Sequence, residues 1–262
     1  MIKAKKSLGQ NFLIDNNIIN KIVNVVDIEN KPILEIGPGT GNLTASLIKK
    51  KPKKFYVVEK DKRLAQSLKE KFESQIIVIN DDILNIDENY ISEQELIVFG
   101  NLPYNISTEI ICKWILNLND KKIWFNSLVL MFQKEVADRI ISKFGSKSYG
   151  RLSIITNWRL DIKKIIDIKP NCFTPKPKVD SSLLIFFPKK EYYKFKNPKN
   201  LEKITRIFFN HRRKMIKKPF NTIFQNKDEI LKKLHINLNL RPHNLNFDTY
   251  YKLTSELEKL QS

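Results

Sequence analysis

Cysteine and long apolar runs are both scarce in this chain of 262 residues. The only cysteines are Cys112 and Cys172, too few for a disulfide framework or a thiolate metal site, and the three histidines lack ligand-like spacing, so we expect no metal. No stretch reaches the roughly 18 uninterrupted apolar residues of a membrane span, and the basic N-terminus lacks the apolar centre of a secretory signal. These absences predict a cytoplasmic protein with no membrane contact.

Acidic residues are also in the minority. Lys and Arg outnumber Asp and Glu by 47 to 28, which gives a net charge of +19 and a pI near 9.7. This balance favours a polyanionic partner, because each phosphate contacted releases counterions. Only eight of the basic residues are arginine, however, while lysine, asparagine and isoleucine are all abundant. Compositional drift in an AT-rich genome would produce part of the same excess.

Short apolar runs alternate with helix-like segments through the first half of the chain. Their continuous apolar character, rich in Val and Ile, is typical of strands buried on both faces of a parallel sheet. The expected strands are 32–36, 54–59, 75–79, 95–99 and 127–132, with helices near 41–50, 61–73 and 107–117. The alternation predicts a doubly wound α/β sheet with its site at the carboxyl ends of the strands.

The flanking segments predict a second, smaller domain. The other elements expected before residue 188 are helices at 15–26, with Asp15 as N-cap, 134–144 and 150–159, and strands at 163–168 and 182–187. The stretch 187–200 is rich in lysine, lacks apolar periodicity and is typical of a linker. Beyond it, 201–220 and 227–234 have helical patterns with basic faces. We therefore expect domains at 1–188 and 189–262, the second all-α.

A glycine-rich turn, "ILEIGPGTGNLT" (33–44), follows the first expected strand. Gly37, Gly39 and Gly41 allow positive φ and let a ligand approach the backbone. No Lys-Ser/Thr pair follows, so the turn is not a P-loop, and Asn42 stands where a dinucleotide fingerprint has Gly or Ala. The carboxylate of Glu35, two residues before Gly37, suits a sulfonium or amino group better than a pyrophosphate.

Two further carboxylates follow the next strands. Glu59 ends the second strand, where an acidic residue can accept both ribose hydroxyls, and Asp82 follows the third, where it can accept from an adenine amino group. With Glu35 they suit S-adenosylmethionine, which has a ribose, an adenine and a cationic methyl donor but no phosphate. A purely structural turn is the alternative. The ordered recurrence of these residues after successive strands favours the nucleoside site.

The fourth strand runs into "GNLPYNIST" (100–108). Exocyclic amines of nucleobases are poor nucleophiles, because the nitrogen lone pair is delocalised into the ring. The Asn101 side-chain carbonyl and the Leu102 backbone carbonyl, restricted by Pro103, can accept from such an amine and favour the tetrahedral nitrogen that attacks a methyl group. Tyr104 offers a face for an extruded base. An Asn-Pro-type turn, the alternative, leaves Tyr104 unexplained.

These motifs resemble those of the ribosomal RNA adenine N6,N6-dimethyltransferases of the KsgA type. The resemblance spans nearly the whole chain. Beyond the two motifs above, it is carried by "SLGQNFL" (7–13), "QKEVADRI" (133–140), "YGRLSI" (149–154), "FTPKPKVDS" (173–181) and "NHRRK" (210–214). It implies a class I, Rossmann-like methyltransferase sheet in 1–188, a helical domain that contacts RNA or the ribosome in 189–262, and S-adenosylmethionine as methyl donor.

The resemblance also implies a substrate and site residues. The substrate would be two adjacent adenosines near the 3′ end of 16S rRNA, in an immature small subunit, dimethylated during ribosome biogenesis by a monomeric enzyme. The implied cofactor contacts are Asn11, Leu13, Gly37, Glu59, Asp82 and Asn101, and Phe173 would face Tyr104 across the target base. One departure is Ile83, where these enzymes commonly have a small Ala.

Basic residues of the C-terminal domain are candidates for phosphate contacts. They are Arg206, Arg212, Arg213, Lys214, Lys217 and Lys218. A solvated helix face explains any one of them equally well. We expect the cluster to position the RNA while the N-terminal domain performs the chemistry.

Two alternatives of function stay open. An Erm-type enzyme, which methylates large-subunit rRNA, shares the glycine turn and a related N-x-P motif, although "NLPYNIST" and "FTPKPKVDSS" favour the small-subunit enzyme. A non-catalytic nucleic-acid-binding relative on the same fold is the other, and the intact asparagine and glycines disfavour it.

Overall fold

The computed structural model describes residues 3–119, 122–224 and 227–261, and the chain divides into two compact units. The first unit comprises Met1–Lys113, Leu118–Ala137 and Ile162–Pro188. The second comprises Trp114–Asn117, Asp138–Asp161 and Lys189–Ser262. The second unit thus contains the expected C-terminal domain and also takes short segments that the single boundary at 188 assigns to the first. The chain passes between the two units more than once.

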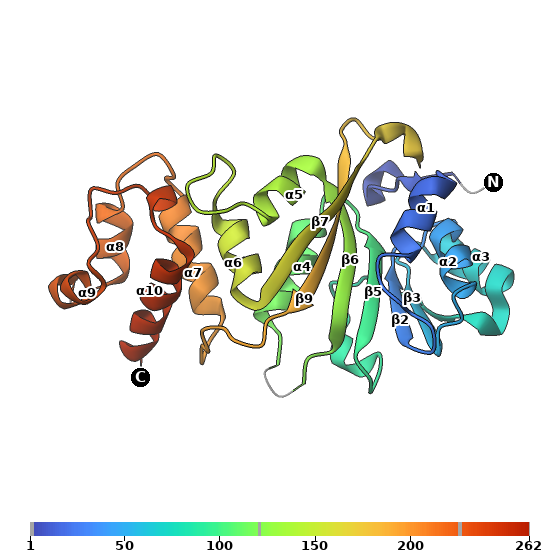
Figure 1. Ribbon diagram of the computed structural model, residues 1–262, viewed down its shortest axis with the longest axis horizontal. Coiled ribbons are helices and arrows are strands. Elements are labelled where there is room, and N and C mark those ends of the chain that lie inside the picture. Colours follow the sequence, from blue (N-terminus) through green and yellow to red (C-terminus); the bar gives the residue numbers. More distant parts are fainter. Residues whose placement is uncertain (1–2, 120–121, 225–226, 262) are drawn as a thin grey trace. The chain divides into compact units, whose positions relative to one another are not determined.

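A seven-stranded sheet organises the first unit, with the strand order β4-β3-β2-β5-β6-β9-β7 (Figure 1). The strands are β2 (Pro32–Ile36), β3 (Lys54–Val58), β4 (Ile77–Ile79), β5 (Leu96–Asn101), β6 (Phe125–Gln133), β7 (Leu160–Ile168) and β9 (Ser181–Pro188). The pairs β3–β4, β2–β3, β2–β5 and β5–β6 are parallel, and β6–β9 is antiparallel. The expected α/β sheet is confirmed, in a mixed form.

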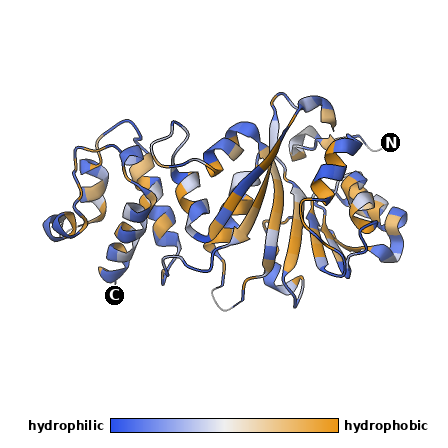
Figure 2. Cartoon of the chain, viewed as in Figure 1, coloured by the Kyte–Doolittle hydropathy of each residue, from blue (hydrophilic) through white to orange (hydrophobic). Residues whose placement is uncertain are grey.

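Five helices of the described residues belong wholly or largely to the first unit, and two of them begin with an aspartate cap. They are α1 (Asn16–Val23), α2 (Asn42–Ile48), α3 (Lys62–Phe72), α4 (Ser107–Leu116) and α5 (Lys134–Ile140); the last three residues of α4 and of α5 belong to the second unit. Asp15 caps α1 by accepting from the Ile18 amide, as expected, and Asp61 caps α3 in the same way at Arg63. Apolar side chains of α1, α2 and α3 form one buried cluster with those of β2, β3, β5 and β6. In Figure 2 most strands of the sheet are orange, whereas β7 is partly blue.

A two-stranded ribbon lies outside the sequence-based expectations. In it β1 (Phe12–Leu13) pairs antiparallel with β8 (Phe173–Thr174), so that Leu13 stands opposite Phe173. Such short strands carry no recognisable periodicity. The ribbon joins the N-terminal segment to the proline-rich motif at 173–181.

Helices make up most of the second unit: α6 (Arg151–Arg159), α7 (Lys199–Phe209), α8 (Lys217–Ile223), α9 (Lys227–Leu234) and α10 (Phe247–Lys259). The helical pattern expected over 201–220 is split into α7 and α8. The expected linker packs on α6, since Phe195 stacks on Trp158 with ring centroids 4.9 Å apart. No helix of the described residues is long and apolar enough to cross a membrane.

Candidate active site

A pocket opens at the carboxyl ends of β2, β3, β4 and β5 in the first unit. It is lined by residues 7–13, 35–40, 42–43, 58–60, 81–83 and 101–106. Parallel strands bring their carboxyl ends to one edge of a sheet, so motifs far apart in sequence meet there. The pocket gathers all of the expected cofactor and catalytic residues, but not Phe173, the second expected stacking residue.

The glycine turn lines this pocket with left-handed backbone. The φ angles are +65° at Gly37, +59° at Gly39 and +77° at Gly41, which is the N-cap of α2. A side chain at Gly39 would stand 2.7 Å from the Phe12 ring, and one at Gly41 would collide with Phe72. A Cβ at Gly37 would have the Asn101 carbonyl oxygen as its nearest neighbour, 3.7 Å away. Gly39 and Gly41 therefore allow the Phe12 and Phe72 rings to pack against the turn, whereas Gly37 leaves the backbone accessible to a ligand.

Glu59 follows β3 and lies against this turn. Its Oε2 accepts from the Gly39 amide at 3.2 Å, and its Oε1 accepts from the Asp61 amide at 2.8 Å. The residue is buried, and this burial raises the pKa of its carboxyl group. The two amides fix the carboxylate at the pocket wall, where the sequence predicts a ribose contact.

Glu35 differs from its expectation as a ligand-facing carboxylate. It lines the pocket, but its side chain is buried in β2 and accepts from the Thr44 hydroxyl at 2.7 Å. Burial raises the pKa of Glu35 to about 8, so the group is mostly protonated at neutral pH. Glu35 thus links β2 to α2 in the interior, because its partner Thr44 belongs to α2.

Asp82 follows β4, and both of its carboxylate oxygens have partners. Oδ1 accepts from the Leu84 amide at 3.1 Å, and Oδ2 forms an ion pair with Lys60 at 2.6 Å. The loop beyond it is held from α4, because the Lys113 ammonium donates to the Ile83 carbonyl at 2.9 Å and to Glu88 at 2.8 Å. The side chain of Ile83 is buried at the pocket wall.

The turn after β5 presents Asn101 with a defined orientation. Asn101 Nδ2 donates to the Asn11 carbonyl oxygen at 2.7 Å. Since a carbonyl oxygen only accepts, the amide nitrogen must face it, and Oδ1 is left to accept from another group. The Leu102 side chain is buried next to Gly100 and anchors the turn. Pro103 accepts from the Ile106 amide at 3.1 Å and closes it.

Tyr104 and Phe173, the two expected stacking residues, lie in different surroundings. The Tyr104 hydroxyl is hydrogen-bonded to Ser181 Oγ at 2.6 Å, so the last residue of the proline-rich motif holds the ring. Phe173 is only 2% exposed, belongs to the apolar cluster beside Leu13 and does not line the pocket. The expected position of Phe173 opposite Tyr104 is therefore not seen, because the β1–β8 ribbon turns its ring into the core.

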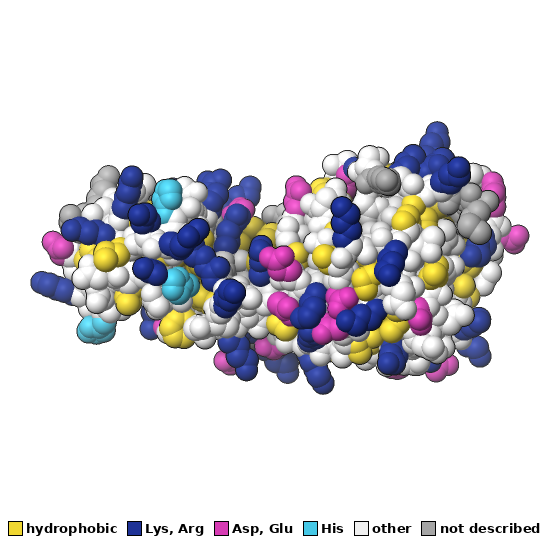
Figure 3. All heavy atoms as spheres, turned by 90° about the horizontal axis from the view of Figure 1, so that it is seen from above, with side chains coloured by type: hydrophobic (Ala, Val, Ile, Leu, Met, Phe, Trp, Pro, Cys, Tyr) yellow, Lys and Arg dark blue, Asp and Glu magenta, His cyan; other side chains and the backbone are white. Residues whose placement is uncertain are grey.

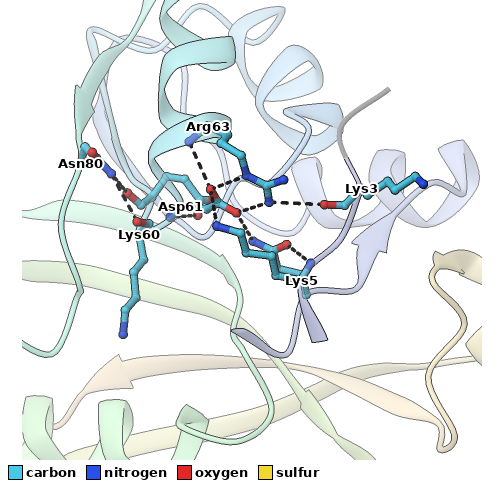
Figure 4. A network of polar contacts seen from close by, with 8 residues as sticks. Lys3, Lys5, Lys60, Asp61, Arg63 and Asn80 are labelled. Carbon is cyan, nitrogen blue, oxygen red and sulfur yellow. Dashed lines mark hydrogen bonds and ion pairs between the residues drawn. The ribbon is translucent and has the colours of Figure 1, made fainter. Parts of the chain in front are cut away.

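The N-terminal segment closes one side of the pocket. Asn42, the departure from the dinucleotide fingerprint, donates to the Leu13 carbonyl at 2.8 Å and ties the segment to α2. At Asp61 the carboxylate binds Lys5, Gln10 and Arg63 (Figure 4). Lys5, Asp61 and Arg63 were not singled out from the sequence, and Asn42 was noted only as that departure. The one available signal was the short spacing of acidic residues in "VEKD" (58–61), directly after a strand.

The six basic residues expected to contact RNA are all exposed. Arg212 differs from the others, since its guanidinium donates to the carbonyls of Lys147 at 2.6 Å and Tyr149 at 3.0 Å. It braces the loop before α6. Among the described residues, no cluster of His, Cys, Asp or Glu is arranged to hold a metal ion.

The seven-stranded sheet and the pocket at its carboxyl edge define a methyltransferase with a Rossmann-like fold. The chain belongs to the ribosomal RNA adenine dimethylase family, whose sequence model matches residues 1–259. It is accordingly an rRNA adenine dimethyltransferase, of a family that uses S-adenosylmethionine.

Individual proteins agree with this assignment. The chain is 64% identical to the ribosomal RNA small subunit methyltransferase A of Pelagibacter ubique (strain HTCC1062), over 99% of both chains. It is 43% identical to the protein of that name from Ehrlichia ruminantium (strain Gardel), over 95% of both. The crystal structure of a dimethyladenosine transferase from Plasmodium falciparum superposes with a TM-score of 0.81 at 26% identity, covering 95% of this chain and 98% of that one.

A second solved structure is similar in fold alone. It is the 23S rRNA methyltransferase ErmE, with a TM-score of 0.68 at 22% identity, covering 95% of this chain and 100% of that one. The fold is thus shared with an enzyme named for the other ribosomal subunit.

Proposed function

We propose that this enzyme dimethylates the N6 amino groups of two adjacent adenosines near the 3′ end of 16S rRNA, as part of small-subunit biogenesis. The observation that carries the proposal is the orientation of Asn101, whose Oδ1 is left to accept from an amine at the mouth of the pocket. The name shared by the relatives from Pelagibacter and Ehrlichia supports the small subunit as the source of that amine. The enzyme works as a cytoplasmic monomer on an immature particle, with no membrane contact.

The pocket fits S-adenosylmethionine by the chemistry of its donor set. A phosphate would meet the carboxylates of Glu59 and Asp82, whereas a nucleoside without phosphates offers them hydroxyl and amino donors. We propose that Glu59 accepts from the ribose, that Asp82 accepts from the adenine amino group, and that Gly37 gives the backbone clearance. Asn11, Leu13 and Asn101 complete the contacts. Since Lys60 already pairs with Asp82, the adenine amine shares that oxygen with an ammonium.

When bound, S-adenosylmethionine supplies an electrophilic methyl group. Asn101 Oδ1 and the Leu102 carbonyl accept from the target amine, which favours tetrahedral nitrogen and stabilises the charge that develops on it. Tyr104, held by Ser181, stacks on the extruded base. The methylated amine is acidic enough to lose its proton to water, so the reaction as proposed needs no metal. Phe173 would have to leave the core to reach the base.

The second unit supplies the electrostatic part of RNA binding in this proposal. We propose that residues 1–188 carry the chemistry and 189–262 contact rRNA through Arg206, Arg213, Lys214, Lys217 and Lys218, with Arg212 also bracing its loop. Dark-blue Lys and Arg side chains are spread over this unit, with few acidic ones among them, on the face seen in Figure 3. Such a surface suits phosphate contacts without base reading.

Methylation of isolated ribosomal particles tests the proposal. Small and large subunits that lack these methyl groups are incubated with enzyme and S-adenosylmethionine, and nuclease digests are analysed by mass spectrometry. We expect dimethyladenosine at two adjacent positions of small-subunit rRNA. Methylation of the large subunit instead would assign the Erm-type activity, and methylation of neither would leave a nucleic-acid-binding role.

A further inference from the structure

The carboxylate of Asp61 is the centre of an unusually dense set of contacts. Its side chain is 0% exposed, although it lies at the N-terminus of α3. Arg63 binds it through Nε at 3.1 Å and Nη2 at 2.7 Å, and Lys5 forms an ion pair with it at 3.3 Å (Figure 4). The hydrogen bonds from Arg63 hold the pKa of Asp61 well below its usual range, so the group stays charged. A helix cap alone requires none of these partners.

These contacts anchor the N-terminal segment. Gln10 donates from Nε2 to Asp61 Oδ2 at 3.3 Å and accepts the Lys5 amide at Oε1, 2.7 Å away. Arg63 also donates to the Lys3 carbonyl at 3.4 Å. Contacts between residues 51 to 60 positions apart in the sequence thereby fix residues 3–10 to the start of α3. The residue directly after Gln10 is Asn11, whose carbonyl holds Asn101.

Close packing leaves the segment little freedom between these two ends. Gly9 has a φ of +63°, and a side chain there would stand 2.9 Å from Asn105 Oδ1 and 3.8 Å from Pro103. The segment therefore lies directly on the turn that follows β5. A displacement at Gln10 would shift the adjacent Asn11, because only the φ and ψ torsions of Asn11 separate the peptide unit shared by the two residues from the Asn11 carbonyl.

The orientation of the Asn101 amide decides whether it accepts or donates. With Nδ2 on the Asn11 carbonyl, Oδ1 can accept from an amine, whereas a rotated amide would present N–H groups to N–H groups. We propose that Asp61 is a positioning residue for methyl transfer: it anchors Lys5 and Gln10, so that the Asn11 carbonyl keeps Asn101 Oδ1 directed at the target amine. This inference rests on the proposed function, since it concerns the same site.

Asp61→Asn is the first test. Asparagine and aspartate are about equally good N-cap residues, so α3 keeps its cap while Lys5 and Arg63 lose the negative charge that they bind. We expect kcat for adenosine methylation on small-subunit particles to fall about tenfold, with the KM for the particles unchanged, because the amide is misplaced while RNA contacts stay intact. Asp15→Asn, the same change at the cap of α1, is the matched control and should keep kcat.

Gln10→Ala tests the same path from its other end. This variant leaves Asp61 and its helix cap in place and removes both bonds of the Gln10 side chain, the one to the carboxylate and the one from the Lys5 amide. We expect a smaller fall in kcat than for Asp61→Asn. The double variant should be no slower than Asp61→Asn alone, because both changes act on one link. A purely structural role of Asp61 would instead give independent losses, or lower the melting temperature without changing kcat.

Cleavage by trypsin after Lys5 gives a readout that needs no methylation. We expect faster cleavage in Asp61→Asn than in the wild type and in Asp15→Asn. An unchanged cleavage rate, or a normal kcat in both Asp61→Asn and Gln10→Ala, overturns the inference. If Asp61→Asn does not fold, the kcat and cleavage rate of Gln10→Ala decide alone. A wild type that methylates neither subunit contradicts the proposed function, and the cleavage rates still decide whether Asp61 anchors the segment.

Discussion

Polar side chains are held very differently in the pocket of the first unit and on the basic surface of the second. In the pocket, Glu59 receives two backbone amides and Asn101 is fixed by a carbonyl. On the second unit, the six candidate RNA-binding residues are exposed, and among these six only Arg212 donates to backbone carbonyls. Bond-making chemistry requires placement within fractions of an ångström, whereas attraction of a polyanion requires only charge density. The predictions below test that difference.

The largest effect is expected from Asn101→Ala. Because this change removes the acceptor that we propose acts in the transition state, methyl transfer should fall by about 10²–10³-fold or more while rRNA affinity is unchanged. The measurements are the rate of dimethyladenosine formation and equilibrium binding to small subunits. Asn20→Ala, at an exposed position of α1, is the control. Retained dimethylation by Asn101→Ala would show that precise placement of this pocket residue is not required for the chemistry.

Glu59→Gln comes next. The change places an NH2 group against the amide of Gly39 or Asp61 and weakens the acceptor that we propose for a ribose. Affinity for S-adenosylmethionine should fall about 10–100-fold, as expected for the loss of a hydrogen bond to a charged group. Calorimetric titration measures it, with Glu95→Gln at an exposed position as control. Undiminished affinity would show that Glu59 only holds the turn.

Reversal of charge at Arg213 and Lys214 tests the second region. Arg213→Glu with Lys214→Glu should weaken rRNA binding roughly tenfold and reduce the salt slope by about 2, without changing the affinity for S-adenosylmethionine. Lys49→Glu with Lys54→Glu, both exposed on the first unit, makes the same change in net charge. Equal losses in the two double variants would mean that only net charge matters. Arg212 is spared because it braces a loop.

The smallest effect on catalysis is expected from Glu35→Gln, which instead changes how stability depends on pH. The folded pKa of Glu35 is about 8 and its ordinary value is 4.5, so the folded state binds this proton more tightly. Stability contributed by the protonated group is complete below pH 4.5 and is lost as pH rises through 8. The variant should gain stability relative to the wild type over this interval, on the order of a few kcal/mol. Urea unfolding at several pH values measures it; a constant difference would contradict it.

Periodicity predicted the sheet because its strands are continuous apolar runs. The expected strand 32–36 coincides with β2, and the expected cap at Asp15 is seen. The pocket was predictable for a related reason, since the carboxyl ends of parallel strands must meet. By contrast, α10 was missed because polar residues interrupt its apolar pattern, and its cap at Asn246 gives only a weak signal.

Contacts between distant segments account for the rest. Nothing near Phe173 in sequence reveals that pairing of Leu13 with Phe173 turns the ring into the core. The anion at Asp61 likewise acquires its role only from Lys5 and Gln10, which precede it by more than fifty residues. Local patterns contain no information about such partners until the chain is folded.

The interleaving of the two units has a consequence for synthesis on the ribosome. Helix α6 leaves the exit tunnel long before α7 and α10, yet Trp158 is covered by Phe195, and Tyr251 of α10 donates to the Ile154 carbonyl at 3.0 Å. Until these later segments emerge, the apolar face of α6 lacks its native packing partners, and its exposure favours aggregation or binding by chaperones. The same holds for a fragment cut at residue 188, since it would keep α6 and lose its cover. The second unit therefore completes its fold only when the last helix has been made.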